Sequence, residues 1–362
     1  MIMIERLYSV SQHKEKIYFI IFIGCAVAIT FLITYFYLSD NFRFLCMIGR
    51  IENYKCVNEI PKHSYQCAIK SNDTSFIQEL ESKCETIFDG VWVKIPETNI
   101  KINSWGFRDY EYPIEKSNNT FRIIVLGDSI TFGWGVELNE SYPKIIENLL
   151  NSNPTLKSDI KYEVLNFGVP GYSISEKVRF FEKLGIKFNP DLVIIQYGSD
   201  DIINNTELKM LSEKILSNYM TENSINNIDS ITQALLNKKT KEMYVEELSK
   251  KSFDEVWKNI EYPLEELGNI TVRTNKSVLI WIIHSNDAIP HFSIKEQLKN
   301  LKEVSIKYKW DILIGIMDKN YNKYNWWDLI IHPEDGHPNA FTHKLIAKEI
   351  YEKLIKDKLI PN

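Results

Sequence analysis

Cysteine is scarce in this chain and absent from most of it. Only five cysteines occur among 362 residues, and none follows residue 84. Cys25 stands apart, and the other four lie in one short segment: Cys46, Cys56, Cys67 and Cys84. The long spacings, with only His63 nearby, disfavour a zinc site. An even, clustered set indicates two disulfides in an oxidising compartment, with three pairings open; four free thiols in a cytoplasmic segment are the alternative.

The chain also lacks the marks of several protein classes. It has no excess of basic residues, since its formal net charge is −5. That charge argues against nucleic acid as a main partner. We find no Gly-rich phosphate loop, no zinc signature, no basic patch and no internal repeat in the sequence. The absence of these motifs leaves nucleotide-binding and zinc-dependent functions without support.

One long apolar run lies near the N-terminus. Residues 17–38 are 22 consecutive residues without a charged side chain, which is long enough for a helix to cross a membrane. A cleaved signal peptide would have a shorter apolar core followed by small residues, whereas Ala26 and Ala28 lie inside this run. We therefore expect a single-pass transmembrane anchor. Basic residues flank it on both sides, so its orientation rests on the cysteine cluster, which favours an extracytoplasmic catalytic domain.

The anchor divides the chain into four expected parts. They are an N-terminal tail (1–16), the anchor (17–38), a cysteine-bearing stalk or small module (39–90) and a main domain (91–362). Within the main domain, residues 203–250 are polar with weak helical periodicity. We interpret them as an insertion and a candidate lid.

From residue 122 onward, strand and helix patterns alternate. Apolar runs predict strands at 122–126, 162–166, 191–197, 277–283 and 311–315. Amphipathic patterns predict helices at roughly 141–151, 173–185, 253–267, 293–307 and 339–356. This alternation predicts an α/β fold with a parallel sheet covered on both faces. In such a sheet the site lies at the carboxyl ends of the strands.

A serine stands where the first of these strands ends. The apolar residues 123–126 run directly into Gly127, Asp128 and Ser129, and a helical stretch follows. A serine at a strand-to-helix turn is exposed and lies near a helix N-terminus, which favours developing negative charge. Ser129 is therefore the candidate nucleophile.

Three further segments fall at the expected strand ends or before the final helix. They are Asn166 to Tyr172, Gly198 to Asp201, and Glu334 to Asn339. Together with Gly127-Asp128-Ser129 and the lead-in Asn103 to Arg108, they resemble the SGNH/GDSL family of serine esterases and acyl hydrolases, over about residues 100–356. The resemblance implies a three-layer α/β/α, flavodoxin-like domain with a five-stranded parallel sheet, working without metal or cofactor.

The resemblance assigns roles residue by residue. Ser129 matches the nucleophile, and His337 matches the general base. The acid that orients His337 is either Asp335, two residues before it, or Glu334, three residues before it. The common family spacing would select Glu334, and some acyltransferase-like members use the shorter spacing. We favour Asp335, because its shorter side chain is easier to hold in a tight turn.

The expected oxyanion hole departs from the family. Its members use the serine N–H, a glycine N–H and an asparagine side chain; Ser129 and Gly168 match the first two, but Asp200 occupies the asparagine position. An ionised carboxylate donates no hydrogen bond, and losing one donor typically costs about 2.7–4 kcal/mol. Three alternatives stay open: a protonated Asp200, a substitute donor from Ser199 or Asn204, or impaired catalysis.

Two further side chains near these motifs need an interpretation. Trp134 is either a wall of an acyl pocket or a core aromatic residue. His343 lacks the motif context of His337, and we expect it to pack on the final helix.

These observations lead to three functional hypotheses. The first is a membrane-anchored serine ester hydrolase that forms an acyl-enzyme and acts on a lipid ester or an acylated carbohydrate. The alternative is an O-acyltransferase that uses the same residues to modify a carbohydrate or cell-envelope polymer. The second alternative is a catalytically impaired binding protein, because Asp200 replaces the oxyanion asparagine.

Overall fold

A computed structural model describes residues 66–73, 75–90, 94–157, 159–222, 230–283, 293–315, 324, 328–332 and 335–361. All of them belong to one compact unit, Pro61–Asn362. The expected anchor at 17–38, Cys46 and Cys56 therefore lie outside the described residues. Within the described part, no helix is both long enough and apolar enough to span a membrane.

Five parallel strands form the central sheet of the described unit, which confirms the predicted α/β fold. Their order is β6-β5-β7-β8-β9. The strands are β5 (Thr120–Gly127), β6 (Lys161–Gly168), β7 (Leu192–Gly198), β8 (Ser277–Ile283) and β9 (Asp311–Ile314). Strand β6, which follows β5 in the chain, lies on one side of β5, and the next strand, β7, lies on the other side. This reversal creates a switch point at the carboxyl ends of β5 and β7, where open α/β sheets bind ligands.

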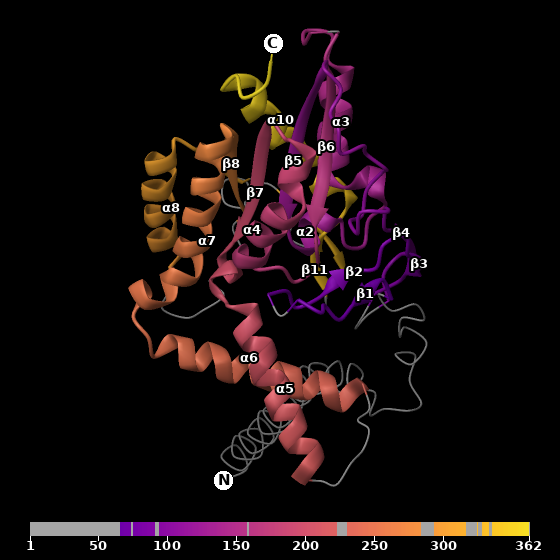
Figure 1. Ribbon diagram of the computed structural model, residues 1–362. Helices are drawn as coiled ribbons and strands as arrows, with labels where there is room; N and C mark the ends of the chain where they lie inside the picture. The colour runs from indigo at the N-terminus through magenta and orange to yellow at the C-terminus, as the bar shows by residue number, and fades with distance from the viewer. Residues whose placement is uncertain are drawn as a thin grey trace, which may run out of the picture. The chain divides into compact units, whose positions relative to one another are not determined.

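Helices cover both faces of the sheet (Figure 1). One layer contains α4 (Ile174–Lys183), α7 (Phe253–Thr274) and α8 (Ile294–Tyr308), and the other contains α3 (Tyr142–Ser152) and α10 (Ala340–Lys356). The alternation of side chains along a strand explains why two apolar cores form. In β5, Ile124 and Leu126 join the first core, whereas Ile123 and Val125 join the second.

Helix α7 runs seven residues beyond its expected end at 267. It continues through Gly268, which lies against Tyr308 of α8; a Cβ there would come within 2.4 Å of the Tyr308 ring. The helix ends instead at Asn275, which adopts a left-handed conformation with φ 53°. The close approach of two helices thus explains a glycine that local propensity alone would place at a helix end.

The polar segment 203–250 forms two helices, α5 (Asn205–Glu222) and α6 (Ser230–Ser249). Tyr244 of α6 donates a hydrogen bond to Glu207 of α5 at 2.8 Å. Tyr244 and Leu248 also join the core that contains α7. Lys209 donates to the backbone carbonyl of Ile77 at 2.6 Å. The pair of helices is therefore tied to two parts of the unit, and its role as a lid stays a prediction.

In the described part of the segment before the sheet, a disulfide joins Cys67 and Cys84. The strands of this segment are β1 (Ala68–Ile69), β2 (Glu79–Leu80), β3 (Glu85–Phe88) and β4 (Thr98–Lys101). Strands β3 and β4 pair with each other, so the boundary expected at residue 90 lies inside this hairpin. The cluster around Cys67 also includes Phe132 and Tyr172, which belong to the segments that follow β5 and β6 at the carboxyl end of the sheet. The disulfide-bonded segment thus packs on the part of the domain that bears the candidate site.

Candidate functional site

The turn that carries Ser129 is fixed from both ends. Helix α2 (Ser129–Phe132) follows β5 directly, and Asp128 caps it by accepting a hydrogen bond from the Ile130 N–H at 2.8 Å. At the other end, the buried guanidinium of Arg108 donates to the carbonyls of Phe132 and Gly133 at 3.2 and 2.7 Å. Arg108 therefore explains the lead-in motif: it satisfies carbonyl groups that the end of a helix leaves unpaired.

The structure brings Ser129, His337 and Asp335 together. His337 and Asp335 lie on β11 (Asp335–Pro338), which pairs with β10 (Ile330–His332). The Nε2 atom of His337 lies 2.8 Å from Ser129 Oγ, and its Nδ1 atom is hydrogen-bonded to Asp335 Oδ1. A proton on Nδ1, held by the carboxylate, leaves Nε2 free to accept from the serine hydroxyl. Glu334, the other candidate acid, lies outside the described residues.

Asp335 is held as a carboxylate. Burial acts to raise the pKa of Asp335, but the hydrogen bonds from His337 and Trp134 and the charge of His337 outweigh it, so the pKa lies below its usual value. A second contact comes from the indole N–H of Trp134, which donates to Asp335 Oδ2 at 3.2 Å. Each carboxylate oxygen therefore accepts a hydrogen bond.

Asn339 explains why an asparagine follows the His-Pro pair. It caps α10 by accepting a hydrogen bond from the Thr342 N–H at 3.0 Å. Its amide group donates to the carbonyls of Asp328 and Ile330 at 2.9 and 3.2 Å. One side chain thus joins the start of α10 to the strand opposite His337, which fixes the loop that presents the histidine.

Gly168 lies against the nucleophile helix. A Cβ at this position would come within 2.2 Å of the Phe132 backbone nitrogen, so only glycine lets β6 end this close to α2. The Gly168 N–H donates to the side-chain oxygen of Asn166 at 2.9 Å. The expected oxyanion donor is therefore beside the nucleophile turn, and its hydrogen is engaged within the protein.

The segment after β7 forms a short 3-10 turn, η4 (Ser199–Ile202). Asp201 accepts hydrogen bonds from the Gly198 N–H and from the buried Lys177, both at 2.8 Å. The side chains of Ser199 and Asp200 lie outside what the structure describes. Asn204, considered as a substitute donor, directs its amide to Glu207 at 3.2 Å, at the start of α5.

Lys177 and Gln196 link the two turns beneath the site, and the sequence patterns did not identify either. Lys177 has a fully buried side chain whose Nζ lies 3.6 Å from Asp128 as well as beside Asp201. Gln196 donates to Asp128 Oδ2 at 2.8 Å. Because Lys177 falls on the helix α4 and Gln196 within a buried strand, only their polar character in apolar surroundings could have signalled this role.

His343 packs on α10, as expected. It is fully buried, and its Nδ1 accepts a hydrogen bond from the Tyr142 N–H at 3.2 Å. Burial lowers the pKa of His343 to about 3, so the ring is neutral. Among the described residues, no group of three or more His, Cys, Asp or Glu side chains is arranged to hold a metal ion.

Residues 123–350 match the family model of the GDSL-like Lipase/Acylhydrolase family. Three solved structures are similar to the chain at low identity. The structure of TesA has 13% identity and a TM-score of 0.43, covering 66% of this chain and 99% of that chain. Esterase EstA from Pseudoalteromonas sp. has 16% identity and a TM-score of 0.42, covering 67% and 99%. The lipase/acylhydrolase from Enterococcus faecalis has 17% identity and a TM-score of 0.41, covering 67% and 98%. No curated protein sequence matches the chain significantly.

Proposed function

The chain belongs to the GDSL-like lipase/acylhydrolase family and is a hydrolase of ester bonds, and we propose that Ser129 is its nucleophile. The observation that carries the proposal is the 2.8 Å contact between Ser129 Oγ and His337 Nε2, with Asp335 bonded to the other ring nitrogen. Asp335 orients the imidazole and stabilises its protonated form. The three side chains provide what covalent ester hydrolysis requires: a nucleophile, a base within hydrogen-bond reach and an orienting acid.

The reaction proceeds in two halves. Ser129 Oγ attacks the ester carbonyl carbon while His337 Nε2 takes the serine proton. When the tetrahedral intermediate collapses, the ester C–O bond breaks and His337 gives the proton to the leaving alkoxide, which leaves an acyl-enzyme. Water, deprotonated by His337, then attacks the acyl carbon, and Ser129 leaves with its proton restored. The backbone N–H groups of Ser129 and Gly168 are the proposed oxyanion donors, and the Gly168 N–H is hydrogen-bonded to Asn166 in the free protein.

The test of this function is ester hydrolysis by the full chain, with Ser129→Ala as the control. Short- and long-chain p-nitrophenyl esters would separate acetyl esterase from lipase activity. Serine-dependent turnover supports the hydrolase. Faster acyl transfer to a sugar hydroxyl than to water would indicate the O-acyltransferase. A folded protein that neither turns over esters nor reacts with a serine-directed phosphonate would refute the proposed nucleophile and favour a binding protein.

Asp200 gives a separate prediction. If Asp200 acts as a protonated donor, activity rises at mildly acidic pH, and Asp200→Asn raises the rate at neutral pH because an amide donates a hydrogen bond at any pH. Recovering one oxyanion donor in full would raise kcat by on the order of 10²-fold to 10³-fold. The pH profile of kcat for both proteins measures this effect. An unchanged or lower neutral-pH rate in Asp200→Asn would exclude a protonated Asp200 as the donor.

We further propose that residues 17–38 anchor the enzyme in a membrane, with the catalytic domain outside the cytoplasm. The uncharged length of this run supports the anchor, and the Cys67–Cys84 disulfide supports an oxidising compartment. The substrate is then an ester reached at the membrane surface, in a lipid or in an acylated carbohydrate.

Thiol alkylation of the protein isolated from membranes tests the compartment. We expect Cys67 and Cys84 to resist alkylation before reduction and to react after it, because both sulfur atoms are engaged in the disulfide. Alkylation of both residues without reduction, in protein quenched at the moment of lysis, would place the domain in the cytoplasm. Release of the protein by alkaline carbonate washing would contradict the anchor.

A further inference from the structure

We propose that Trp134 is a positioning residue of this site, which holds Asp335 through its indole N–H and confines His337 with its ring. This inference rests on the proposed function of Ser129, His337 and Asp335. Trp134 lies five residues after Ser129 and 201 residues before Asp335, so the contact joins the nucleophile turn to the loop that carries the acid and the base. It is a structural link between the two halves of the site.

Two contacts define this role. The indole N–H donates to Asp335 Oδ2 at 3.2 Å, on the oxygen that His337 does not use. The indole also lies against the imidazole of His337, with ring centroids 5.4 Å apart and planes inclined by 30°. A carboxylate bonded at only one oxygen turns easily about its terminal torsion. With both oxygens bonded, the carboxylate of Asp335 keeps the orientation that aims His337 at Ser129.

Trp134 is itself held by the backbone of the nucleophile turn. Its backbone N–H donates to the Ser129 carbonyl at 3.0 Å. Gly133 and Gly135 flank it with φ of 85° and 73°, a left-handed conformation that L side chains rarely adopt. These glycines reverse the chain after α2 and turn the indole back toward His337. The position of Trp134 is therefore coupled to that of Ser129.

The disulfide-bonded segment holds the indole from its other side. Phe88, at the end of β3, is 1% exposed and packs edge-on against Trp134, with ring centroids 4.4 Å apart. Strand β3 begins at Glu85, directly after the disulfide-bonded Cys84. Such aromatic pairs contribute about 0.5–1.5 kcal/mol beyond their buried area. The disulfide-bonded segment thus takes part in the geometry of the site without carrying Ser129, His337 or Asp335.

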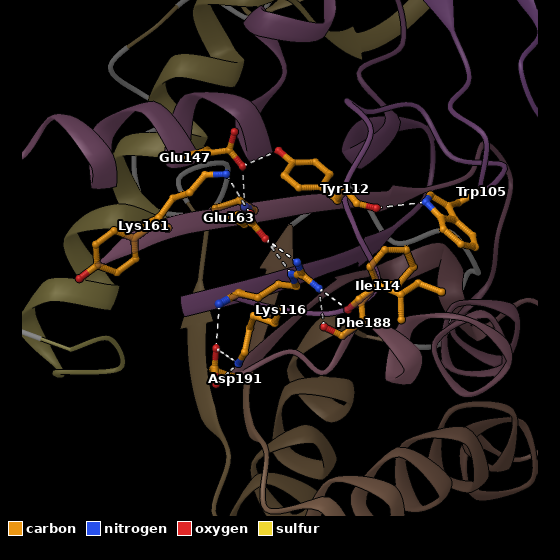
Figure 2. A network of polar contacts seen from close by, with 12 residues as sticks. Trp105, Tyr112, Ile114, Lys116, Glu147, Lys161, Glu163, Phe188 and Asp191 are labelled. Carbon is orange, nitrogen blue, oxygen red and sulfur yellow. Dashed lines mark hydrogen bonds and ion pairs between the residues drawn. The ribbon is translucent and has the colours of Figure 1, made fainter. Parts of the chain in front are cut away.

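The test compares Trp134→Phe with Trp105→Phe in the full chain. Trp134→Phe keeps an aromatic ring beside His337 and Phe88 but removes the hydrogen-bond donor. Trp105→Phe is the matched control: its indole N–H donates to the Tyr112 carbonyl at 3.1 Å, within the network of Figure 2. Both substitutions delete one indole hydrogen bond to an oxygen, and only one of those bonds reaches Asp335. Melting temperatures establish that both variants are folded.

We expect Trp134→Phe to lower kcat by about 10-fold while KM changes by less than about twofold, because orientation and not substrate binding is lost. Trp105→Phe should leave both constants close to wild type. Without the indole donor the pKa of Asp335 rises. The acidic limb of the pH profile of kcat should therefore move to higher pH in Trp134→Phe. A role limited to packing would lower the melting temperature without moving this limb.

A second readout does not depend on turnover. NMR titration of the Asp335 carboxyl carbon, assigned with Asp335→Asn, should give a higher pKa for Asp335 in Trp134→Phe than in wild type, since the Trp134 hydrogen bond is one cause of its lowered pKa. An unchanged titration together with an unchanged kcat would overturn the inference. If the wild-type protein shows no Ser129-dependent turnover, the proposed function fails, and this titration still decides whether Trp134 holds Asp335.

Discussion

Asp335→Asn is expected to lower kcat by on the order of 10³–10⁴-fold with little change in folding. The carboxylate accepts a hydrogen bond from His337 Nδ1, which keeps Nε2 available for the Ser129 hydroxyl. An asparagine amide can donate to Nδ1 and so favour the tautomer that carries its proton on Nε2, which cannot accept the serine proton. Steady-state kinetics with a p-nitrophenyl ester, together with a melting curve, measure both parts of this expectation.

Glu334→Gln is the matched control, because Glu334 is the acid that the common family spacing would select. We expect this variant to retain kcat within a few-fold of wild type, since Asp335 already accepts the hydrogen bond from His337 Nδ1. A larger loss of kcat in Glu334→Gln than in Asp335→Asn would identify Glu334 as the acid that orients His337. Equal losses would show that local loop geometry, and not one carboxylate, limits the rate.

Arg122→Met is expected to destabilise the fold by about 3–5 kcal/mol, because it leaves a buried carboxylate without its main partner. Arg122 is fully buried at the start of β5 and donates from Nε and one terminal nitrogen to Glu163 Oε2 at 2.9 and 2.7 Å. Its other terminal nitrogen donates to the carbonyls of Ile114 and Phe188. Figure 2 shows this network, in which Lys161 also contacts Glu163. Urea unfolding measures the change.

The control for Arg122 is Lys101→Met. Lys101 pairs with Glu85 across the β3–β4 hairpin, but both side chains are more than half exposed. Exposed pairs contribute about 0–1 kcal/mol, so this substitution should shift the unfolding midpoint little. If Arg122→Met also changed the free energy of unfolding only slightly, water or Lys161 would have to stabilise the Glu163 carboxylate in place of Arg122. That result would contradict the burial of this pair.

The Arg122 effect should also depend on pH. Burial acts to raise the pKa of Glu163, but hydrogen bonds and charge from Arg122 and Lys161 outweigh it, and the pKa is lowered. A carboxyl group whose pKa falls on folding stabilises the fold above its unfolded value, and this stabilisation is lost as the pH falls through the folded value. The stability difference between wild type and Arg122→Met should therefore shrink below about pH 4. A difference that stays constant or grows in acid would contradict the ion pair as its cause.

The strand and helix positions were largely predictable from the sequence. The run at 122–126 predicted β5, which spans Thr120–Gly127, and the run at 277–283 matches β8. Buried parallel strands must be apolar on both faces, and helices that cover them must be amphipathic, so the pattern is local and readable. The end of α7 was missed because Gly268 serves contact with Tyr308, a requirement that no local pattern expresses.

The sequence by itself determined the strand-to-helix turn at Ser129 and the motif around His337, because each depends on residues adjacent in the chain. Only the tertiary structure decided which residues contact them. It paired Cys67 with Cys84 among three open pairings, bonded Asp335 to the imidazole of His337, and placed Trp134 beside Asp335 and Lys177 beside Asp128. The Trp134–Asp335 and Lys177–Asp128 contacts join residues far apart in sequence. They depend on strand order and on the close approach that Gly168 allows, and packing, not local propensity, sets both.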